Sequence, residues 1–334
     1  MEDRNHIIDT AKGYGMILVI AGHLFTYGSY PFNFIFSFHM PLFFFLSGFL
    51  FTLEKYPNSR YLFKKIFRTM IATYLFFIII GFFLYAVSGR LNLNEHFLYS
   101  TFFKGQPDVC GSLWFITCLA FVYTSFYYIS KILNNTHSRL ILLILASCLL
   151  AEYLLTKVST QYIPFKFESV PIALFFFTIG YYCKLNNWIH TIKYKWGTVA
   201  LVLTIFFSYT NSTVNICIPT LGNILYFLVA ALGGIYFILT VSKDKSNSFI
   251  RFLGKNSLII FLMDEFIRYY YLEFISLIEQ KTYIAMENIP TSFCIIGTIL
   301  VTLGCASSIY IISPLYNNFI KKLISLTRVM NKQT

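Results

Sequence analysis

Charge is what this sequence has least of. Only 12% of its 334 residues are Asp, Glu, Lys or Arg, whereas a soluble globular domain carries about 25% charged residues. Hydrophobic residues make up 57% of the chain, so the charge present cannot cover the surface of a water-soluble protein. The shortage excludes soluble globular, intrinsically disordered and collagen-like proteins, and it favours a chain embedded in a lipid bilayer.

The sequence also lacks a cysteine framework. Its cysteines number seven, which is odd; no Cys-x-x-Cys pair occurs, and most of them lie within apolar runs. Disulfide scaffolds use even numbers of cysteines, and zinc sites use closely spaced pairs. We therefore expect buried free thiols, without a disulfide scaffold and without a bound metal.

Acidic residues are scarce as well. The chain has 14 Asp and Glu against 26 Lys and Arg, which gives a formal net charge of +12. In a soluble protein this excess would suggest a nucleic-acid partner, but the cytoplasmic loops of membrane proteins also concentrate Lys and Arg. No basic stripe interleaved with aromatic residues is present, so we expect no nucleic-acid binding.

Long apolar runs account for most of the chain. A helix needs about 20 residues to cross a bilayer, and ten runs of about this length can be placed. We predict membrane-spanning helices over 8–27, 32–53, 69–88, 113–131, 139–156, 169–185, 196–212, 219–241, 255–276 and 291–313. No long polar segment interrupts them, so we expect residues 1–334 to form a single all-α integral-membrane domain without a soluble appended domain.

The basic residues orient this predicted bundle. Most of the Lys and Arg residues fall on the side of the N-terminus, as in segments 55–68, 184–195 and 243–255. The opposite side holds only Arg90, Lys104, Lys157, Lys166, Arg268 and Lys281. Because Lys and Arg accumulate on the cytoplasmic side, both termini should be cytoplasmic and the number of spans even.

Two histidines, His23 and His39, lie well inside the predicted spans. An ionisable side chain within a bilayer is costly and usually faces a cavity or a partner. A short turn near residues 29–30 makes the first two spans antiparallel neighbours, so the two imidazoles should lie near each other in the outer half of the membrane. For either residue, a structural histidine bonded to a neighbouring carbonyl is the alternative. Pro41 should also free the carbonyl of Ser37 from its helical hydrogen bond, which leaves a polar backbone group near His39.

The first span carries a further ionisable group, Lys12, eleven residues before His23. Eleven residues make three helical turns plus about 20°, and an axial distance of about 16 Å. Lys12 and His23 should therefore lie on one face of the helix. Asp9 precedes Lys12 by three residues and can pair with it. The alternative for Lys12 is an ordinary side chain that reaches the cytoplasmic interface.

Polar residues also occur in the ninth and fourth predicted spans. Asp264 and Glu265 precede Arg268 by four and three residues. A pairing with Arg268 is the structural alternative to a functional role for Glu265, and Asp264 could compete for the same partner. Ser112 and Trp114 stand at the outer start of the fourth span. A Trp at that level is usually an interfacial anchor, with a substrate-binding role as the alternative.

Several of these residues occur in segments that resemble the membrane-bound acyltransferase 3 family. IDTAKGYGMILVIAGH (8–23) is similar to the family's opening motif, an Asp, an Arg-Gly pair and a His, with ten residues between the Arg and the His. FSFHMPLFFFLSGFLF (36–51) resembles the branch of fucose 4-O-acetylase-like proteins, and KKIFR (64–68) resembles the family's Arg-x-x-Arg element. Three later segments are similar to further family blocks: GSLWFI (111–116), FFTIGYY (176–182) and LGKNSLIIFL (253–262).

Three positions depart from the family pattern. Lys12 stands in place of the usual Arg, which keeps the positive charge but loses the planar guanidinium. The usual Pro after the basic element is absent from IATY (71–74), and Asp264 occupies a position where the family often has His.

The resemblance implies an O-acyltransferase that moves an acetyl group from cytoplasmic acetyl-CoA to a sugar hydroxyl. The acceptor would be a surface polysaccharide or its lipid-linked precursor. The protein would be a multi-pass protein of the bacterial inner membrane, with membrane lipid and the sugar acceptor as partners. Acetyl-CoA would be its co-substrate.

The same resemblance suggests roles for individual residues. His23 would be the general base, because an imidazole titrates near neutral pH, or the nucleophile of a covalent acetyl-histidine variant. His39 would orient the acceptor or assist proton transfer. Lys12 would be the third catalytic residue and would hold the donor. The donor's phosphates would bind the basic residues Lys64, Lys65 and Arg68. Substrate would contact Asp9, Ser112, Trp114 and Asp264.

Two other functions are compatible with the sequence. A secondary transporter or flippase of a sugar or lipid-linked intermediate also carries intramembrane His, Asp and Lys, although residues 1–160 and 161–334 show no convincing internal repeat of the kind common in transporters. A non-catalytic partner of a polysaccharide assembly complex would use the same residues only for helix contacts. Acetyl transfer by the purified protein distinguishes the enzyme from both.

Overall fold

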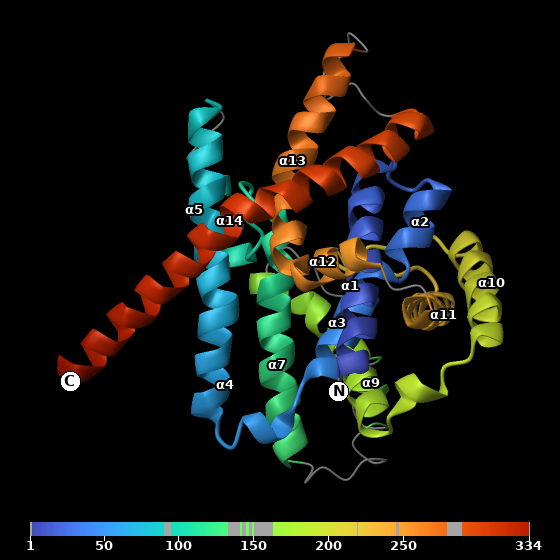
Figure 1. Ribbon diagram of the computed structural model, residues 1–334, viewed down its shortest axis with the longest axis horizontal. Helices are drawn as coiled ribbons and strands as arrows, with labels where there is room; N and C mark the ends of the chain where they lie inside the picture. The colour runs from blue at the N-terminus through green and yellow to red at the C-terminus, as the bar shows by residue number, and fades with distance from the viewer. Residues whose placement is uncertain are drawn as a thin grey trace.

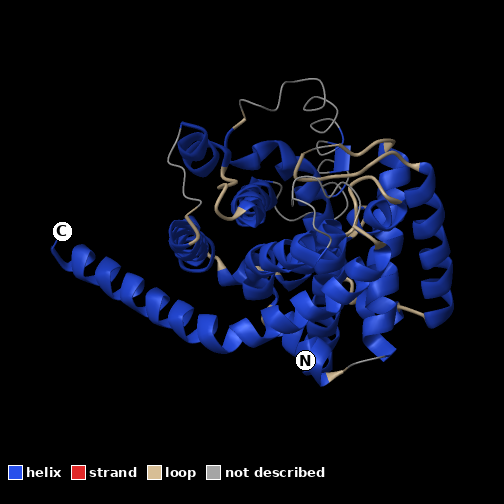
Figure 2. Ribbon diagram, turned by 90° about the horizontal axis from the view of Figure 1, so that it is seen from above, coloured by secondary structure: helices blue, strands red, loops and turns tan. Residues whose placement is uncertain are grey.

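The computed structural model describes residues 2–89, 95–132, 163–218, 220–244, 247–278 and 289–333, together with residues 141, 145, 146 and 149. The regular structure in these residues is helical, and their one β-type pairing is an isolated bridge between Asn215 and Thr220. Figure 2 shows the helices in blue, joined by short loops. The all-α fold predicted from the apolar runs is confirmed.

The described helices follow one another with short connections. They are α1 (Glu2–Leu24), α2 (Tyr30–Phe36), α3 (His39–Leu50), α4 (Ser59–Ile66), α5 (Ala72–Val87), α6 (Glu95–Tyr99), α7 (Trp114–Ile132), α9 (Val170–Leu185), α10 (Tyr194–Thr210), α11 (Ile224–Asp244), α12 (Ser248–Lys255), α13 (Ser257–Ile278) and α14 (Thr291–Gln333). Short 3₁₀ or π segments occupy Leu53–Lys55, Phe67–Ile71, Ser100–Lys104, Gly111–Leu113, Pro164–Ser169 and Trp188–Thr191.

Five helical segments of the described chain are long and apolar enough to cross a membrane. They are Tyr30–Leu50, Ser59–Val87, Gly111–Ile132, Ile224–Lys243 and Thr291–Ser325. Such a set makes the protein a multi-pass membrane helix bundle. The predicted spans 169–185 and 196–212 correspond to α9 and α10, which have 16 and 17 residues. Most of the predicted span 139–156 lies outside the described residues, and the total of ten spans and the cytoplasmic termini remain predictions.

Helix boundaries differ from those predicted at three places. The second span is interrupted between α2 and α3, where Phe38 leaves the helical conformation with φ −139° and ψ −14°. Pro41 then falls in the first turn of α3, where a helix tolerates the missing N–H donor. The third span begins at Ser59 instead of residue 69, and the last helix, α14, continues for 43 residues to Gln333.

Helix α1 lies at the centre of the bundle, in contact with α3, α11, α12, α13 and α14. In Figure 1, α4 and α5 form one side of the bundle and α10 the other, while α14 crosses the bundle and its C-terminal end projects beyond it. The core is rich in fully buried phenylalanines such as Phe44, Phe77 and Phe176. Because α1 borders helices from both halves of the chain, its polar side chains can meet residues that are distant in sequence.

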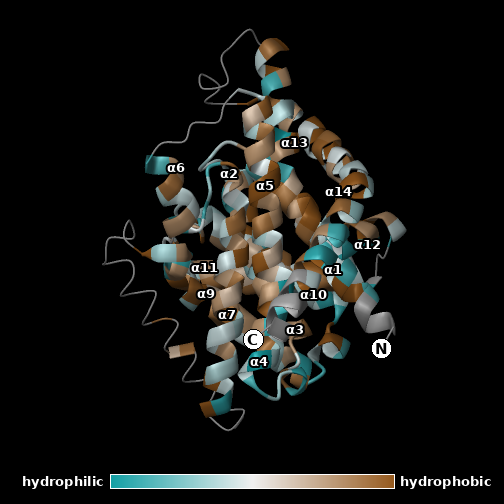
Figure 3. Ribbon diagram, turned by 90° about the vertical axis from the view of Figure 1, so that its left-hand side faces the viewer, coloured by the Kyte–Doolittle hydropathy of each residue, from teal (hydrophilic) through white to brown (hydrophobic). Residues whose placement is uncertain are grey.

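Apolar side chains also cover the outside of the bundle. Phe83 on α5, Phe206 on α10 and Ile299 on α14 are more than half exposed. Figure 3 shows hydrophobic colouring along α5 and over parts of α14. A soluble protein rarely exposes apolar side chains in such numbers, whereas a lipid-facing surface consists of them.

Helices α3 and α9 approach each other closely through two glycines. A Cβ added to Gly48 would lie 1.8 Å from the carbonyl oxygen of Phe177, and one added to Gly180 would lie 1.9 Å from that of Phe45. Small residues allow membrane helices to pack backbone against backbone. This contact fixes α3, which begins at His39.

Candidate active site

A cavity of about 240 Å³ lies among α1, α3, α13 and the start of α7. Its lining includes His23, His39, Ser112, Trp114, Glu265 and Arg268. The structure therefore brings together four of the residues expected to act at one site, from two parts of the chain that are more than 70 residues apart. Two loops complete the wall, with Gln106 from one and Asn215 to Cys217 from the other.

His23 is held by a buried carboxylate. Its Nδ1 lies 2.7 Å from Oδ2 of Asp264, a residue with no exposed surface. A carboxylate only accepts hydrogen bonds, so Nδ1 of a neutral His23 carries the proton and donates it to Asp264. The unprotonated nitrogen is then Nε2. Since His23 lines the cavity, the residue can receive a proton from a bound molecule.

Arg268 adds a positive charge to this pair. Its Nε lies 3.6 Å from the same carboxylate oxygen, one helical turn from Asp264 on α13. The cation favours the ionised form of Asp264, the form that can hold the imidazole. Of the two carboxylates whose spacing allows a pairing with Arg268, Asp264 is the one that forms it among the described residues.

His39 occupies the first position of α3, just after the break that ends α2. Its Nδ1 lies 2.9 Å from the carbonyl oxygen of Ile35 and donates to it. This carbonyl differs from the one that Pro41 was expected to leave free, that of Ser37. The ring of Phe36 lies between the histidines, with centroid distances of 6.1 Å to His23 and 4.6 Å to His39. His39 thus has the backbone bond of a structural histidine and also lines the cavity.

Glu265 fixes the beginning of α7. Its carboxylate accepts hydrogen bonds from the backbone N–H of Gly111 at 3.0 Å, the N–H of Ser112 at 2.9 Å and the hydroxyl of Ser112 at 3.0 Å. A carboxylate at a helix N-terminus satisfies donors that have no partner within the helix. This clamp holds the turn that leads into Trp114, which is 7% exposed and lines the cavity rather than standing at the surface as an interfacial anchor.

A second cavity, of about 160 Å³, continues along the same helices toward the N-terminal end of α1. Lys12 lines it, together with largely apolar side chains of α3, α7 and α13. Met40 and Phe261 line both cavities and form the partition between them. Lys12 and His23 therefore each face one of two adjoining cavities, in agreement with their predicted position on one face of α1.

The remaining basic residues lie elsewhere. Lys64 and Lys65 are exposed on α4, and Arg68 is half-buried in the following π segment; none of them lines the cavity of Lys12 or that of His23. Asp9 is half-buried near the start of α1 and lines neither cavity.

The sequence contained weak signals for some of the lining residues. Glu265 follows Asp264 directly, but nothing in its spacing indicates a contact with residues 111–112. Gln106 and Cys217 come from loops without a periodic pattern. Burial raises the pKa of the Cys217 thiol to about 11, so it stays protonated near neutral pH and is a poor nucleophile. In the described part of the chain, no group of three or more His, Cys, Asp or Glu side chains could hold a metal ion.

A histidine with one nitrogen bonded to a buried carboxylate and facing a cavity is suited to remove a proton from a hydroxyl group. The family model of the acyltransferase 3 family, described as an acyltransferase domain, matches residues 5–322. No curated protein and no solved structure gives a significant match. The family match covers nearly the whole chain, including every residue of both cavities, and the protein therefore belongs to the acyltransferase 3 family.

Proposed function

We propose that the protein is an O-acyltransferase that transfers the acetyl group of cytoplasmic acetyl-CoA to a sugar hydroxyl. The acceptor is a surface polysaccharide or its lipid-linked precursor, and the protein works in the bacterial inner membrane. Membership of an acyltransferase family supports the class of reaction. The observation that carries the proposal is the bond between His23 and Asp264 beside a cavity that also contains His39.

His23 acts as the general base. A sugar hydroxyl is a weak nucleophile and needs a general base. Such a base works best when its pKa lies near the operating pH, and imidazole is the usual choice at neutral pH. Asp264 holds Nδ1 protonated and stabilises the imidazolium that forms when Nε2 takes the hydroxyl proton. Arg268 in turn keeps the carboxylate ionised. Arg268 and Asp264 keep their charges throughout, and this stabilisation of the imidazolium requires little reorganisation because Asp264 is fully buried.

The reaction is a single acyl transfer. The acceptor oxygen attacks the carbonyl carbon of the thioester, a C–O bond forms, and the C–S bond breaks. The hydroxyl proton passes to His23 and then to the leaving thiolate, so the products are an acetate ester and the free thiol of CoA. No oxidant, reductant or further reactant is required.

The donor enters through the cavity of Lys12. This cavity has the largely apolar lining that suits the pantetheine arm and the acetyl group, and the ammonium group of Lys12 suits an anionic part of the donor. The axial distance from Lys12 to His23 is about 16 Å, which an extended pantetheine arm can span. Lys64, Lys65 and Arg68 contribute to binding the nucleotide phosphates only where the donor extends beyond this cavity.

The acceptor occupies the cavity of His23. His39 donates through Nδ1 to Ile35, which leaves Nε2 of the neutral ring to accept a hydrogen bond from a second hydroxyl of the sugar. Trp114 offers an indole face and Ser112 is part of the same wall. Aromatic faces carry partial negative charge and attract the C–H groups of a sugar ring.

The test uses the purified protein in lipid nanodiscs with acetyl-CoA labelled in its acetyl group. The acceptor is the surface glycan of the source cell, from which mild alkali has removed the existing esters. We expect label in the glycan and release of one CoA thiol per acetyl group transferred.

A transporter or flippase would move a sugar or lipid-linked intermediate across vesicles that contain the protein and would leave the glycan unlabelled. A non-catalytic assembly partner would give neither transport nor label. Either result would contradict the proposed reaction.

A further inference from the structure

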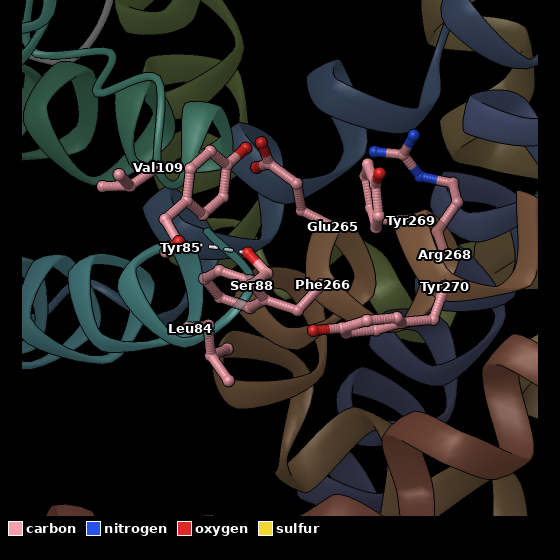
Figure 4. A pocket seen from close by; sticks show the side chains of 9 residues that line it. All are labelled: Leu84, Tyr85, Ser88, Val109, Glu265, Phe266, Arg268, Tyr269 and Tyr270. Atoms are coloured by element: carbon pink, nitrogen blue, oxygen red, sulfur yellow. Dashed lines mark hydrogen bonds between the residues drawn. The ribbon is translucent and has the colours of Figure 1, made fainter. Parts of the chain in front are cut away.

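A third cavity, of about 300 Å³, adjoins the cavity of His23 on the side away from Lys12. It lies between the last turn of α5, Val109 and the middle of α13 (Figure 4). Glu265 and Arg268 line both this cavity and that of His23, so the two share a wall. Its volume is at the lower end of the range for small-ligand pockets, about 300–1,000 Å³.

The lining of this cavity is rich in tyrosine. Tyr85 from α5 and Tyr269 and Tyr270 from α13 contribute three of its nine residues. Figure 4 shows the hydroxyl of Tyr85 directed toward the carboxylate of Glu265, and the ring of Tyr270 along the opposite side of the cavity. Tyr270 is 51% exposed, and Ser88 at the end of α5 is exposed, so the cavity opens to the surface of the helix bundle.

The charges of the lining indicate a neutral ligand. Among the residues that the structure describes, the ionisable side chains of the lining apart from tyrosine are Glu265 and Arg268, whose formal charges cancel. Glu265 would repel a phosphate, and Arg268 already lies 3.6 Å from Asp264. A lipid chain is equally disfavoured, because burying a carboxylate and a guanidinium against hydrocarbon is costly.

A sugar residue fits this combination. Its hydroxyls both donate and accept hydrogen bonds, as tyrosine hydroxyls do, and its C–H faces pack against aromatic rings. We propose that this cavity, the tyrosine subsite (Tyr85, Tyr269 and Tyr270 with Glu265 and Arg268), binds the sugar residue next to the one that is acetylated. The proposal rests on the proposed function, because the neighbouring cavity must hold the reacting sugar. The enzyme then recognises at least two consecutive residues of a glycan.

The shared wall explains how the subsite would affect the reaction. Glu265 clamps the turn at residues 111–112 that leads to Trp114, and Arg268 supports Asp264. A sugar bound against Glu265 and Arg268 therefore contacts the same side chains that shape the reacting cavity. Acceptors of two residues should consequently react with a higher kcat/KM than acceptors of one residue.

The experiment compares acceptor lengths. The alkali-treated glycan of the source cell is cut by partial acid hydrolysis into fragments of one and two sugar residues, and kcat/KM for acetyl transfer is measured for each. The test variant is Tyr270→Ala, chosen because this side chain is half exposed and its removal spares the core. The matched control is Tyr209→Ala, a tyrosine of α10 that is 74% exposed and outside all three cavities.

The wild type should prefer the two-residue fragment. Tyr270→Ala should reduce that preference by about 3- to 10-fold, which is the magnitude of one aromatic packing interaction, while Tyr209→Ala preserves it. Tyr85→Phe, which keeps the ring and removes the hydroxyl, should reduce the preference by a smaller factor.

Equal kcat/KM for both fragments in the wild type would contradict the proposed subsite. Equal losses of the preference in Tyr270→Ala and Tyr209→Ala would contradict it as well. Neither result would contradict the proposed acetyl transfer. A wild type that labels neither fragment nor the intact glycan would overturn the proposed function, and the subsite with it.

Discussion

Replacing Asp264 with Asn tests the pairing on which the proposed chemistry depends. The substitution keeps the size of the side chain and removes the negative charge that lies 2.7 Å from Nδ1 of His23. At a separation of about 4 Å between charge centres and an effective dielectric constant of 20, an imidazolium and a carboxylate attract each other by about 4 kcal/mol. His23 is 24% exposed, so solvent reduces this figure.

We therefore expect Asp264→Asn to lower kcat by about 10²- to 10³-fold, since each 1.36 kcal/mol is a factor of ten in rate. The amide can also turn its NH₂ group toward Nδ1, which places the ring proton on Nε2 and removes the base. The assay is transfer of labelled acetyl groups to the alkali-treated glycan at saturating acetyl-CoA. The value of KM for acetyl-CoA should change little, because Asp264 lines neither cavity.

The chain provides a matched control for this substitution. His96 and Asp108 form a second His–Asp pair at 3.0 Å, but both side chains are exposed and outside all three cavities. Asp108→Asn should leave kcat unchanged. Similar kcat values for Asp264→Asn and the wild type, or equal losses in both Asn variants, would refute the role of Asp264.

Folding must be separated from catalysis in this experiment. Asp264→Asn leaves Arg268 without its counter-ion, and breaking a buried ion pair by removing one partner costs about 3–5 kcal/mol. The double variant Asp264→Asn with Arg268→Gln removes both charges and should recover most of the lost melting temperature. Its kcat should remain low, because His23 still lacks the carboxylate. Recovery of kcat with stability would show that Asp264 acts only in folding.

Three further predictions concern the donor cavity, the partition and the helix packing. Lys12→Ala should raise KM for acetyl-CoA by about 10-fold or more, because it removes a hydrogen bond from a charged group to the donor. Lys12→Arg keeps the charge and should retain affinity. An unchanged KM in Lys12→Ala would show that Lys12 does not bind the donor. Met40→Ala should widen the passage between the two cavities and increase several-fold the rate with propionyl-CoA relative to acetyl-CoA, and an unchanged ratio would show that Met40 does not limit acyl length. Gly180→Ala places a Cβ 1.9 Å from a backbone oxygen, so it should lower stability by about 1–3 kcal/mol, as measured by thermal unfolding in detergent. Gly304→Ala, whose Cβ would lie 3.0 Å from Cγ2 of Ile267 and away from any backbone atom of the facing helix, should cost less, and equal losses would contradict the packing argument.

Much of the fold follows from local properties of the sequence. Apolar runs of about 20 residues predict membrane-spanning helices. In lipid, backbone N–H and C=O groups can form hydrogen bonds only with each other, and a helix pairs them within one segment. The position of Lys12 and His23 on one face follows from helical geometry alone, and both line adjoining cavities. The meeting of His23 and His39 follows from the short turn between the first two spans.

Contacts between distant segments could not be predicted in the same way. The spacing in its own helix offered Glu265 a partner in Arg268, but its hydrogen bonds go to Gly111 and Ser112, more than 150 residues away. Arg268 pairs with Asp264, and Trp114 lies in the cavity wall. Spacing along one helix predicts only contacts within that helix. A buried carboxylate accepts hydrogen bonds from the donors that tertiary packing brings near it, and these can come from distant parts of the sequence.

The role of His23 is tested most directly by acetyl transfer in His23→Ala, measured beside His96→Ala. Loss of a general base lowers a rate by about 10²- to 10⁴-fold, so His23→Ala should transfer label to the glycan at no more than about 1% of the wild-type rate, with unchanged expression and membrane insertion. His96→Ala removes an exposed imidazole and should be as active as the wild type. Transfer by His23→Ala at a rate close to that of the wild type would contradict the account.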